Sequence, residues 1–471
     1  MIFTDFPFLV FAIIFFPLYF VTRGQLRITL MLVASYIFYS WWDWRFLSLL
    51  ILTTLVDYCA ALKIADSRSP SRRHSYLMIS VVANLTVLGF FKYFNFFIDS
   101  AAVVLDSIGL HYSMPVLDIV LPIGISFYTF QSMSYTIDVY RRESRAERSL
   151  LVFATCVAIF PHLVAGPIIR ASTLIPQVRA HHDWSWPRVL RGLECVVWGF
   201  FLKLVLADNL APLVDGRFAH PDTYGGGQLA LGAVGFAFQI YGDFAGYSLI
   251  AIGLGRIMGL NFGKNFNRPY FATDFSDFWR RWHISLSSWL RDYLYISLGG
   301  NRNGAWATRC NLMLTMLLGG LWHGANWTFV VWGFLHGMFL ILQRTVATIV
   351  PLQLPATMDM MMRGLRMALV FACVCLAWVF FRAPDLQQAL HYLYRIGDLR
   401  DFWVRPAESS LVKAYGFIAF VVAIDALTAN QEIRKTYLRS PLLRALGAAF
   451  LIWSIILFGR FDAQAFIYFQ F

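Results

Sequence analysis

Apolar residues run along this chain in long stretches separated by short polar segments, a pattern that predicts an all-α polytopic membrane protein. A helix that spans a bilayer needs about 20 mostly apolar residues. The predicted spans are 6–22, 28–44, 46–63, 76–97, 116–138, 188–206, 228–258, 364–381, 411–429 and 445–460. Two further apolar stretches, 149–169 and 311–343, are interrupted by Pro, Gly and His. We expect these two to enter the membrane and return, with protein or a water-filled cavity around their broken backbone.

Lys and Arg are distributed unevenly among the loops, and this bias predicts the orientation. Arg23 and Arg27 follow the first span, whereas the loop 98–115 carries almost no positive charge. The segment 256–309 is again rich in Lys and Arg. We therefore expect the N-terminus and the C-terminus outside, and the basic loops on the cytoplasmic side.

The composition supports this class and excludes others. Of 471 residues, 58% are hydrophobic and 14% are charged, against roughly 25% charged in an ordinary soluble domain. The net charge of +12 fits cytoplasmic loops better than a nucleic-acid surface, and disorder or a disulfide scaffold is excluded. The six cysteines form no CxxC pair, so no metal site is expected. We predict one membrane-embedded domain over 1–471, without a soluble appendage.

The segment 261–302 is too polar to span and too aromatic to be a loose loop. Asp274 or Ser276 is a candidate cap of a helix that runs to about Leu298. Alternating Arg and Trp residues are typical of a helix that lies in the membrane interface. Two interpretations remain open: a surface anchor, or a basic wall for an anionic donor such as a CoA phosphate. The arginines of that wall would be Arg280, Arg281 and Arg291.

Histidines at membrane depth are candidate functional residues, because burying an ionisable group there is costly. His323 lies in 311–343 among glycines that we expect to loosen the helix: Gly319, Gly320 and Gly324. A neutral imidazole there can act as general base for acyl transfer to an alcohol. His283 is a candidate second member of the site. His336 would point about 220° away from His323 on one continuous helix, which favours a packing role unless the helix breaks.

Two further polar residues are candidates for supporting roles. Asp243 lies in the apolar stretch 228–258 and needs a partner; it would orient a histidine, pair with an arginine, or have a purely structural role. Asn326, with His283, is a candidate to orient the reacting groups or stabilise an oxyanion. The motifs HExxH, GxSxG and Walker A do not occur, which disfavours hydrolase and NTPase functions.

Four long blocks make the chain resemble the membrane-bound O-acyltransferase family, in particular its bacterial alginate O-acetyltransferase branch. They are LPIGISFYTFQSMSYTIDVYR (121–141), FPHLVAGPI (160–168), FWRRWHISLSSWLRDYLYISLGGNR (278–302) and MLLGGLWHGANWTFVVWGFLHG (316–337). The resemblance implies a ring of about ten to twelve transmembrane helices around a central tunnel. It also implies that His323 is the catalytic histidine and His283 the second motif histidine. One departure is DFAGYSL at 243–249, where the branch typically has DFSGYSD, and it bears on which acceptor or partner the chain serves.

The resemblance further implies an enzyme of the bacterial inner membrane, with both termini periplasmic. It would hold no bound cofactor, take acetyl from a cytoplasmic donor such as acetyl-CoA, and pass it across the bilayer to a periplasmic SGNH-type acetyltransferase or acetyl-carrier partner. That partner, within an exopolysaccharide biosynthesis complex, would acetylate alginate or cellulose. Alternatives are acetylation of peptidoglycan or another cell-envelope polymer, and a transporter or scaffold of a polysaccharide-export complex.

Overall fold

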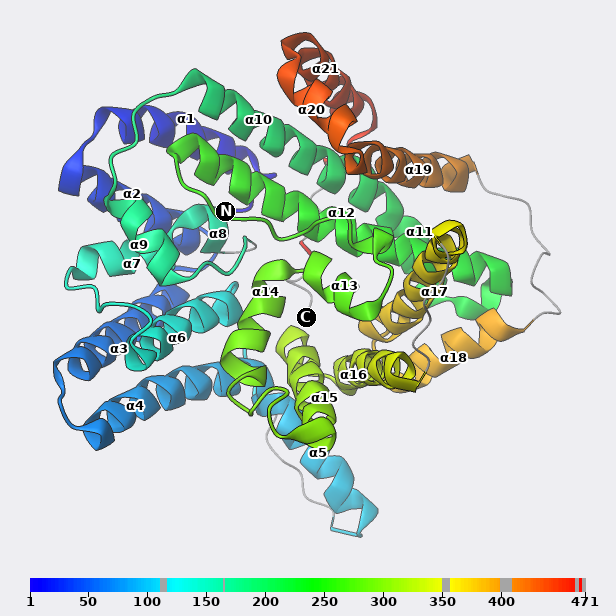
Figure 1. Cartoon of the computed structure of the whole chain (residues 1–471), viewed down its shortest axis with the longest axis horizontal. Helices are drawn as coiled ribbons and strands as arrows, with labels where there is room; N and C mark the ends of the chain where they lie inside the picture. The colour runs from blue at the N-terminus through cyan, green and yellow to red at the C-terminus, as the bar shows by residue number, and fades with distance from the viewer. Residues whose placement is uncertain (111–116, 164–165, 350–355, 399–408, 462–465, 468–471) are drawn as a thin grey trace. The chain divides into compact units, whose positions relative to one another are not determined.

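The structure is a computed structural model, and it describes residues 1–110, 117–163, 166–349, 356–398, 409–461 and 466–467. In this part of the chain every regular element is a helix (Figure 1). The chain falls into two compact units: unit 1 is Met1–Leu193 with Ala251–Gly263, and unit 2 is Glu194–Ile250 with Lys264–Phe471. Because the units interleave along the sequence, no single boundary separates them. The organisation of 1–471 as one domain stays a prediction.

Unit 1 is built from the N-terminal helices and the ends of two longer ones, α10 (Trp186–Phe200) and α12 (Gly226–Met258). Its own elements are α1 (Phe6–Val21), α2 (Gly24–Ser40), η1 (Trp44–Phe46), α3 (Leu47–Asp66), α4 (Pro70–Leu88), η2 (Gly89–Tyr93), α5 (Phe94–Ser107), α6 (Ile125–Arg141), α7 (Leu150–Ala158), α8 (Phe160–Leu163) and α9 (Ala171–Arg179).

Unit 2 contains most of α12 and the elements that carry the candidate histidines. They are η3 (Phe201–Ala207), α11 (Asp208–Ala219), η4 (Pro221–Thr223), η5 (Pro269–Phe271), α13 (Phe275–Arg281), α14 (Ile284–Trp289), η6 (Leu290–Tyr295), α15 (Gly304–His323), α16 (Trp327–Ile349), α17 (Ala356–Arg382), α18 (Leu386–Gly397), α19 (Ser409–Ala429), α20 (Gln431–Arg439) and α21 (Pro441–Phe458).

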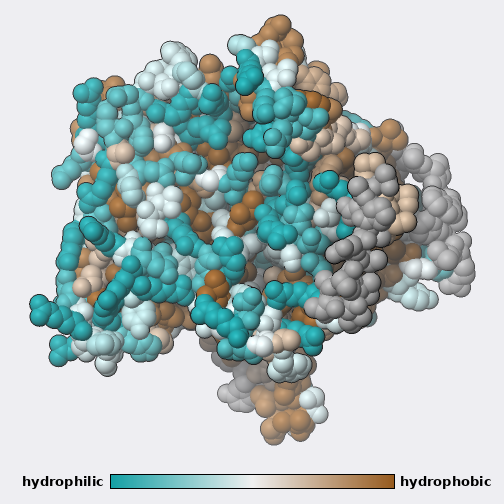
Figure 2. Space-filling view, viewed as in Figure 1, coloured by the Kyte–Doolittle hydropathy of each residue, from teal (hydrophilic) through white to brown (hydrophobic). Residues whose placement is uncertain are grey.

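Seven helical stretches in the described residues are long and apolar enough to cross a membrane. They are Trp44–Asp66, Pro70–Ser107, Gly226–Met258, Trp327–Val346, Met360–Arg382, Leu411–Ala429 and Pro441–Phe458, and the shorter Phe6–Val21 is apolar as well. Exposed apolar side chains mark the surfaces that lipid would cover; on α5 they include Phe97, Val103 and Val104, and Figure 2 shows hydrophobic side chains over this helix. The all-α, multi-pass class is thus confirmed, whereas the ring, its tunnel and the number of ten to twelve spans stay predictions.

One predicted span differs from the structure for a local reason, and one predicted interruption is present. The span predicted at 116–138 begins only at Ile125, because Pro122 cannot donate to a helix ladder and Gly124 adopts a left-handed φ of 76°. The stretch 149–169 contains two short helices, α7 and α8, and their junction at Ile159 leaves helical geometry with a ψ of 118°. The predicted interruption of this apolar stretch is therefore present.

A buried polar cluster joins three helices of unit 1. The carboxylate of Asp57 on α3 accepts hydrogen bonds from Ser80 Oγ (2.5 Å), from Asn84 Nδ2 (2.9 and 3.0 Å) and from Ser132 Oγ. The donors lie on α4 and α6. Without water to satisfy them, polar side chains at membrane depth bond across helices, so this cluster fixes α3, α4 and α6 against one another.

Candidate functional site

His323 is the last residue of α15, at the point where this helix turns back into α16. The two helices pack at very short range through glycines. A Cβ on Gly320 would lie 2.2 Å from the carbonyl oxygen of Phe329, and a Cβ on Gly333 would lie 2.3 Å from that of Met316. Only glycine permits so close an approach of two backbones. Gly320 and Gly333 therefore determine where the end of α15 lies, and this is the point from which the His323 side chain projects.

The predicted helix from Asp274 to about Leu298 is not continuous, and His283 lies at its first break. Asp274 caps α13 as predicted, since its Oδ1 accepts from the amide of Asp277 at 2.8 Å. The helix ends at Arg281, and His283 adopts a left-handed conformation (φ 41°, ψ 55°) before α14 begins. A residue other than glycine rarely occupies this region, and such strain is concentrated at functional sites.

Asn265 holds His283 in this strained conformation. Its amide oxygen accepts hydrogen bonds from His283 Nδ1 (3.2 Å), from the Ser285 hydroxyl (2.9 Å) and from the Ser285 amide (3.3 Å). Its amide nitrogen donates to Ser248 Oγ at 3.0 Å, and its backbone oxygen accepts from the Ile284 amide. Because Nδ1 carries the hydrogen in this arrangement, Nε2 of His283 carries the lone pair.

The two histidines lie close together in an aromatic enclosure. Their ring centres are 6.4 Å apart, and both side chains are buried. The rings around them belong to Phe244, Trp322, Trp332 and Phe381, with centre-to-centre distances of 4.6 to 5.9 Å. Burial lowers the pKa of His283 to about 3, so this imidazole stays neutral at physiological pH. A neutral histidine can accept a proton or attack a carbonyl carbon.

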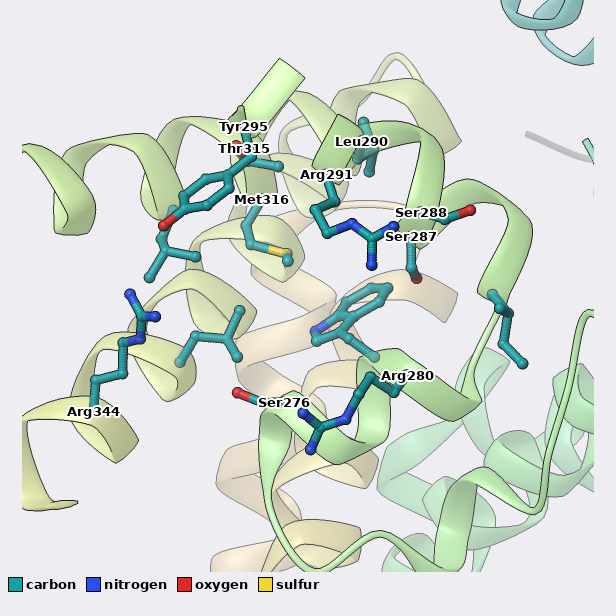
Figure 3. Close-up of a pocket in the computed structure, with 14 residues that line it drawn as sticks. Ser276, Arg280, Ser287, Ser288, Leu290, Arg291, Tyr295, Thr315, Met316 and Arg344 are labelled. Atoms are coloured by element: carbon teal, nitrogen blue, oxygen red, sulfur yellow. The ribbon is translucent and has the colours of Figure 1, made fainter. Parts of the chain in front are cut away.

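A cavity of about 400 Å³ opens beside this enclosure, within the range typical of small-molecule sites. Arg280, Arg291 and Arg344 line it, and Figure 3 shows their side chains reaching it from α13, η6 and α16. Trp279, another lining residue, lies 5.8 Å from Trp332, the ring that contacts His323. Ring contacts through Trp279 and Trp332 thus connect the lining of this cavity with His323.

Arg281 has a different environment from its neighbour Arg280. Its Nε pairs with Asp277 at 2.9 Å, and it is not among the residues that line the cavity. Arg291 lines the cavity while its Nε pairs with Asp292 at 2.7 Å. Two of the three arginines predicted to face an anionic donor therefore reach one cavity, and Arg344 joins them.

Asn326 lies in the turn that follows His323, and His336 lies on α16. Asn326 Oδ1 accepts from the Thr328 amide at 3.0 Å, and Nδ2 donates to the Pro384 oxygen at 2.8 Å. These bonds cap α16 and attach it to the end of α17. His336 is fully buried and packs on Trp332 and Trp279 at 4.7 and 5.0 Å. Although the chain breaks between α15 and α16, His336 and His323 both contact the ring system of Trp332.

In the part of the chain that the structure describes, Asp243 pairs with a lysine and not with the histidine or arginine of two predicted alternatives. Lys203 Nζ lies 2.9 Å from Asp243 Oδ1 and 2.8 Å from Asp208 Oδ1, and all three side chains are buried. Asp243 Oδ2 accepts from the amide of Ile467 at 2.7 Å. A buried carboxylate requires such partners. Asp243 on α12 therefore joins Lys203 of η3 to the backbone of Ile467.

Sequence reasoning missed Asn265, Arg344 and Lys203. Asn265 lies in a non-helical segment 18 residues before His283, where no periodicity connects the two. Arg344 directly follows the apolar stretch 311–343, where a positive charge by itself indicates only the cytoplasmic side. The lysine at position 203, inside an apolar stretch, did carry a signal, because a buried ammonium requires a carboxylate partner.

Comparison with known proteins shows what the chain as a whole is similar to. The chain is 46% identical over 392 residues to the probable alginate O-acetylase of Azotobacter vinelandii, covering 83% of this chain and 76% of that protein. It is 40% identical to the probable alginate O-acetylase of Pseudomonas putida over the full length of both. It is 36% identical to a peptidoglycan O-acetyltransferase of Helicobacter pylori, covering 77% and 72%. Residues 36–382 match the membrane-bound O-acyltransferase family. The chain belongs to this family and is a multi-pass membrane acyltransferase.

Proposed function

We propose that this enzyme takes acetyl from cytoplasmic acetyl-CoA and delivers it across the inner membrane for O-acetylation of an exopolysaccharide such as alginate. The observation that carries the proposal is the buried pair His323 and His283, 6.4 Å apart beside an arginine-lined cavity. Similarity to two probable alginate O-acetylases supports the choice of acceptor pathway. The proposed orientation in the membrane has both termini in the periplasm and the arginine-lined cavity open to the cytoplasm.

The donor would bind with its phosphates on the arginines of the cavity. Arg280, Arg291 and Arg344 supply three guanidinium groups, which bind phosphate oxygens through charge-assisted hydrogen bonds. The apolar part of the lining includes Leu312, Met316 and Leu340, which suits the uncharged pantetheine arm. The thioester would then extend past Trp279 and Trp332 toward His323.

His323 would carry out the transfer in one of two ways. As a base, it takes the proton of an acceptor hydroxyl while the hydroxyl oxygen attacks the thioester carbonyl carbon. The C–S bond breaks, and the imidazolium returns the proton to the departing CoA thiolate. As a nucleophile, its nitrogen forms the C–N bond of an acetyl-imidazole and releases CoA, and the acceptor then removes the acetyl. His283 lies within reach to orient the acceptor or stabilise developing charge.

The acceptor on the outer side would be a periplasmic SGNH-type acetyltransferase or another acetyl carrier, which completes transfer to the polysaccharide. Acetylation of peptidoglycan is the second candidate, and similarity to the Helicobacter pylori enzyme favours it over other cell-envelope polymers. The membrane enzyme would be nearly the same in both cases, because the partner reads the polymer.

The test uses purified protein in nanodiscs with radiolabelled acetyl-CoA, with and without the periplasmic partner. Wild type should release CoA and label the acceptor, and His323→Ala and His283→Ala should each lose this turnover. The matched control is His391→Ala, which removes an exposed histidine paired with Asp222. Turnover retained by His323→Ala, or lost equally in the control, would refute the assignment. Substrate flux without CoA release would favour a transporter.

The donor site is tested by comparing two adjacent arginines. Arg280→Ala and Arg344→Ala should raise KM for acetyl-CoA, because each removes a guanidinium from the cavity. Arg281→Ala should leave KM near wild type and lower stability, because it breaks the pair with Asp277. Equal KM values for Arg280→Ala and wild type would place donor binding elsewhere.

A further inference from the structure

Unit 1 contains a second basic cavity, separate from the one beside the histidines. It has a volume of about 840 Å³ and is formed where the turn between α3 and α4 meets the loop between α6 and α7. Glu143 is the single acidic residue among the residues that line this cavity. Its basic lining residues are Arg68, Arg73, Arg142, Arg145 and Arg148. We propose that this cavity at the α3–α4 turn binds the headgroup of an anionic phospholipid.

Two of the arginines are fixed by the protein itself. Arg73 Nη2 donates to the backbone oxygen of Tyr140 at 2.7 Å, and its guanidinium lies 5.6 Å from the centre of the Tyr140 ring. Arg148 forms two hydrogen bonds to Asp66, at 2.6 and 3.1 Å. These contacts attach the α6–α7 side of the cavity to α3 and α4. The walls are therefore held in place before any ligand binds.

The other three arginines have no carboxylate partner in the described structure. Arg68, Arg142 and Arg145 take part in none of its ion pairs, although Glu143 lines the same cavity. Arg142 adopts a left-handed φ of 64° directly after α6, a conformation that costs energy in a residue with a side chain. The cavity lining thus carries an excess of positive charge at one place. An anion with several oxygens is the ligand that this arrangement fits.

The position of the cavity points to a lipid as the source of that anion. The apolar stretches Trp44–Asp66 and Pro70–Ser107 end and begin at the α3–α4 turn, so the turn lies at the level of the phospholipid headgroups. The exposed side chains of Ile79 and Val82 continue along α4 from this end and offer a surface for acyl chains. Figure 2 shows hydrophilic side chains over this end of unit 1, at the left of the view.

A free nucleotide fits the cavity less well. The lining residues other than arginine and glutamate are small or aliphatic: Ala65, Ser67, Val139, Ser144 and Ala146. None of them offers an aromatic ring on which a base could stack. The Lys/Arg bias predicts that this end faces the cytoplasm, where anionic lipids attract basic residues next to membrane spans. The ligand class is therefore a phosphodiester headgroup such as that of phosphatidylglycerol or cardiolipin.

The test measures lipid retention on the full-length protein in nanodiscs of phosphatidylcholine with one-fifth phosphatidylglycerol. Native mass spectrometry after release into detergent counts bound phosphatidylglycerol. The variant Arg68→Ala/Arg142→Ala/Arg145→Ala should bind it roughly 100-fold more weakly, because each cation near the surface contributes several-fold to binding. The matched control, Arg434→Ala/Lys435→Ala/Arg439→Ala, removes three cations from the exposed helix α20 and should behave as wild type.

Two further measurements, of thermal stability and of competition by inorganic phosphate, complete the test. Wild type should melt at higher temperature in nanodiscs with phosphatidylglycerol than in pure phosphatidylcholine, and the Arg→Lys triple variant, which retains the charge, should keep part of that shift. Inorganic phosphate at tens of millimolar should not displace the lipid. Equal lipid retention by the alanine variant and wild type, equal loss in the α20 control, or full displacement by inorganic phosphate would each overturn the proposal.

Discussion

Replacing Gly320 by alanine tests how the α15–α16 turn positions His323. The added Cβ would lie 2.2 Å from the Phe329 carbonyl oxygen and 3.2 Å from the Cα of Gly333. Ordinary van der Waals contact begins at 3.4 Å, so the two helices must separate locally by about 1 Å. Backbone atoms cannot rotate away as a flexible side chain would. The strain must therefore be relieved by moving α15 against α16.

The expected cost of this movement has two parts. Overpacking of a tight interface destabilises by about 1–3 kcal/mol, which thermal unfolding in detergent will record as a lower midpoint. His323 lies three residues after Gly320 at the end of the same helix. A misplacement of about 1 Å at a reacting group costs on the order of 100-fold in rate. Acetyl transfer should therefore fall much more than the loss of stability alone would cause.

The matched control is Gly416→Ala on α19, where an added Cβ meets no atom within 4 Å. Alanine is the better helix former by about 1 kcal/mol, so this variant should be as stable as wild type or slightly more stable, with full activity. Gly333→Ala inserts a Cβ 2.3 Å from the Met316 oxygen and should reproduce the defect from the opposite helix. If Gly320→Ala matched Gly416→Ala in both assays, the close packing of this turn would not position His323.

Three further predictions concern the surrounding residues. Lys203→Met should lower stability by about 3–5 kcal/mol in thermal unfolding, because Asp208 and Asp243 lose the cation between them; wild-type stability would contradict this. Asn265→Leu should cost about 1–3 kcal/mol and lower kcat for acetyl transfer while KM stays nearly constant, and an unchanged kcat would exclude a positioning role. Below pH 6.5 the His283 side chain binds a proton in the unfolded state. It does not do so in the folded state, where burial lowers its pKa to about 3. Stability should thus fall by about 2 kcal/mol between pH 6.5 and 5, and His283→Gln should lack this part of the slope.

Six of the seven helical stretches in the described residues that are long and apolar enough to cross a membrane overlap spans predicted from hydropathy, because lipid leaves the backbone few alternatives. Where the prediction was wrong, a local backbone feature was the cause. Gly124 delays the start of α6, which a window average over 116–138 cannot detect. The break at His283 gave no such signal, because its immediate neighbours are neither Pro nor Gly. That break depends on hydrogen bonds from Asn265, which only the folded chain brings to it.

The glycines before His323 illustrate a different limit. The sequence indicated that Gly319 and Gly320 loosen the helix and create space. In the structure Gly320 lies against the backbone of α16, whereas at Gly319 an added Cβ would meet only the flexible side chain of Leu290, at 3.2 Å. A glycine in an apolar helix marks either a flexible point or a close approach. Which of the two applies depends on the partner helix, and the sequence of one helix does not contain that information.

The left-handed backbone at His283 links the structure of the site to its chemistry. A straight helix through residue 283 would avoid the strain and is what the surrounding residues favour, yet Asn265 and Ser285 hold the chain in the costlier conformation. Strained residues persist only where neighbouring contacts over-determine them. Here those contacts fix the tautomer of His283 and hold its ring 6.4 Å from that of His323. A purely structural turn at this position would favour glycine, so a histidine held there by Asn265 is consistent with a role in the reaction.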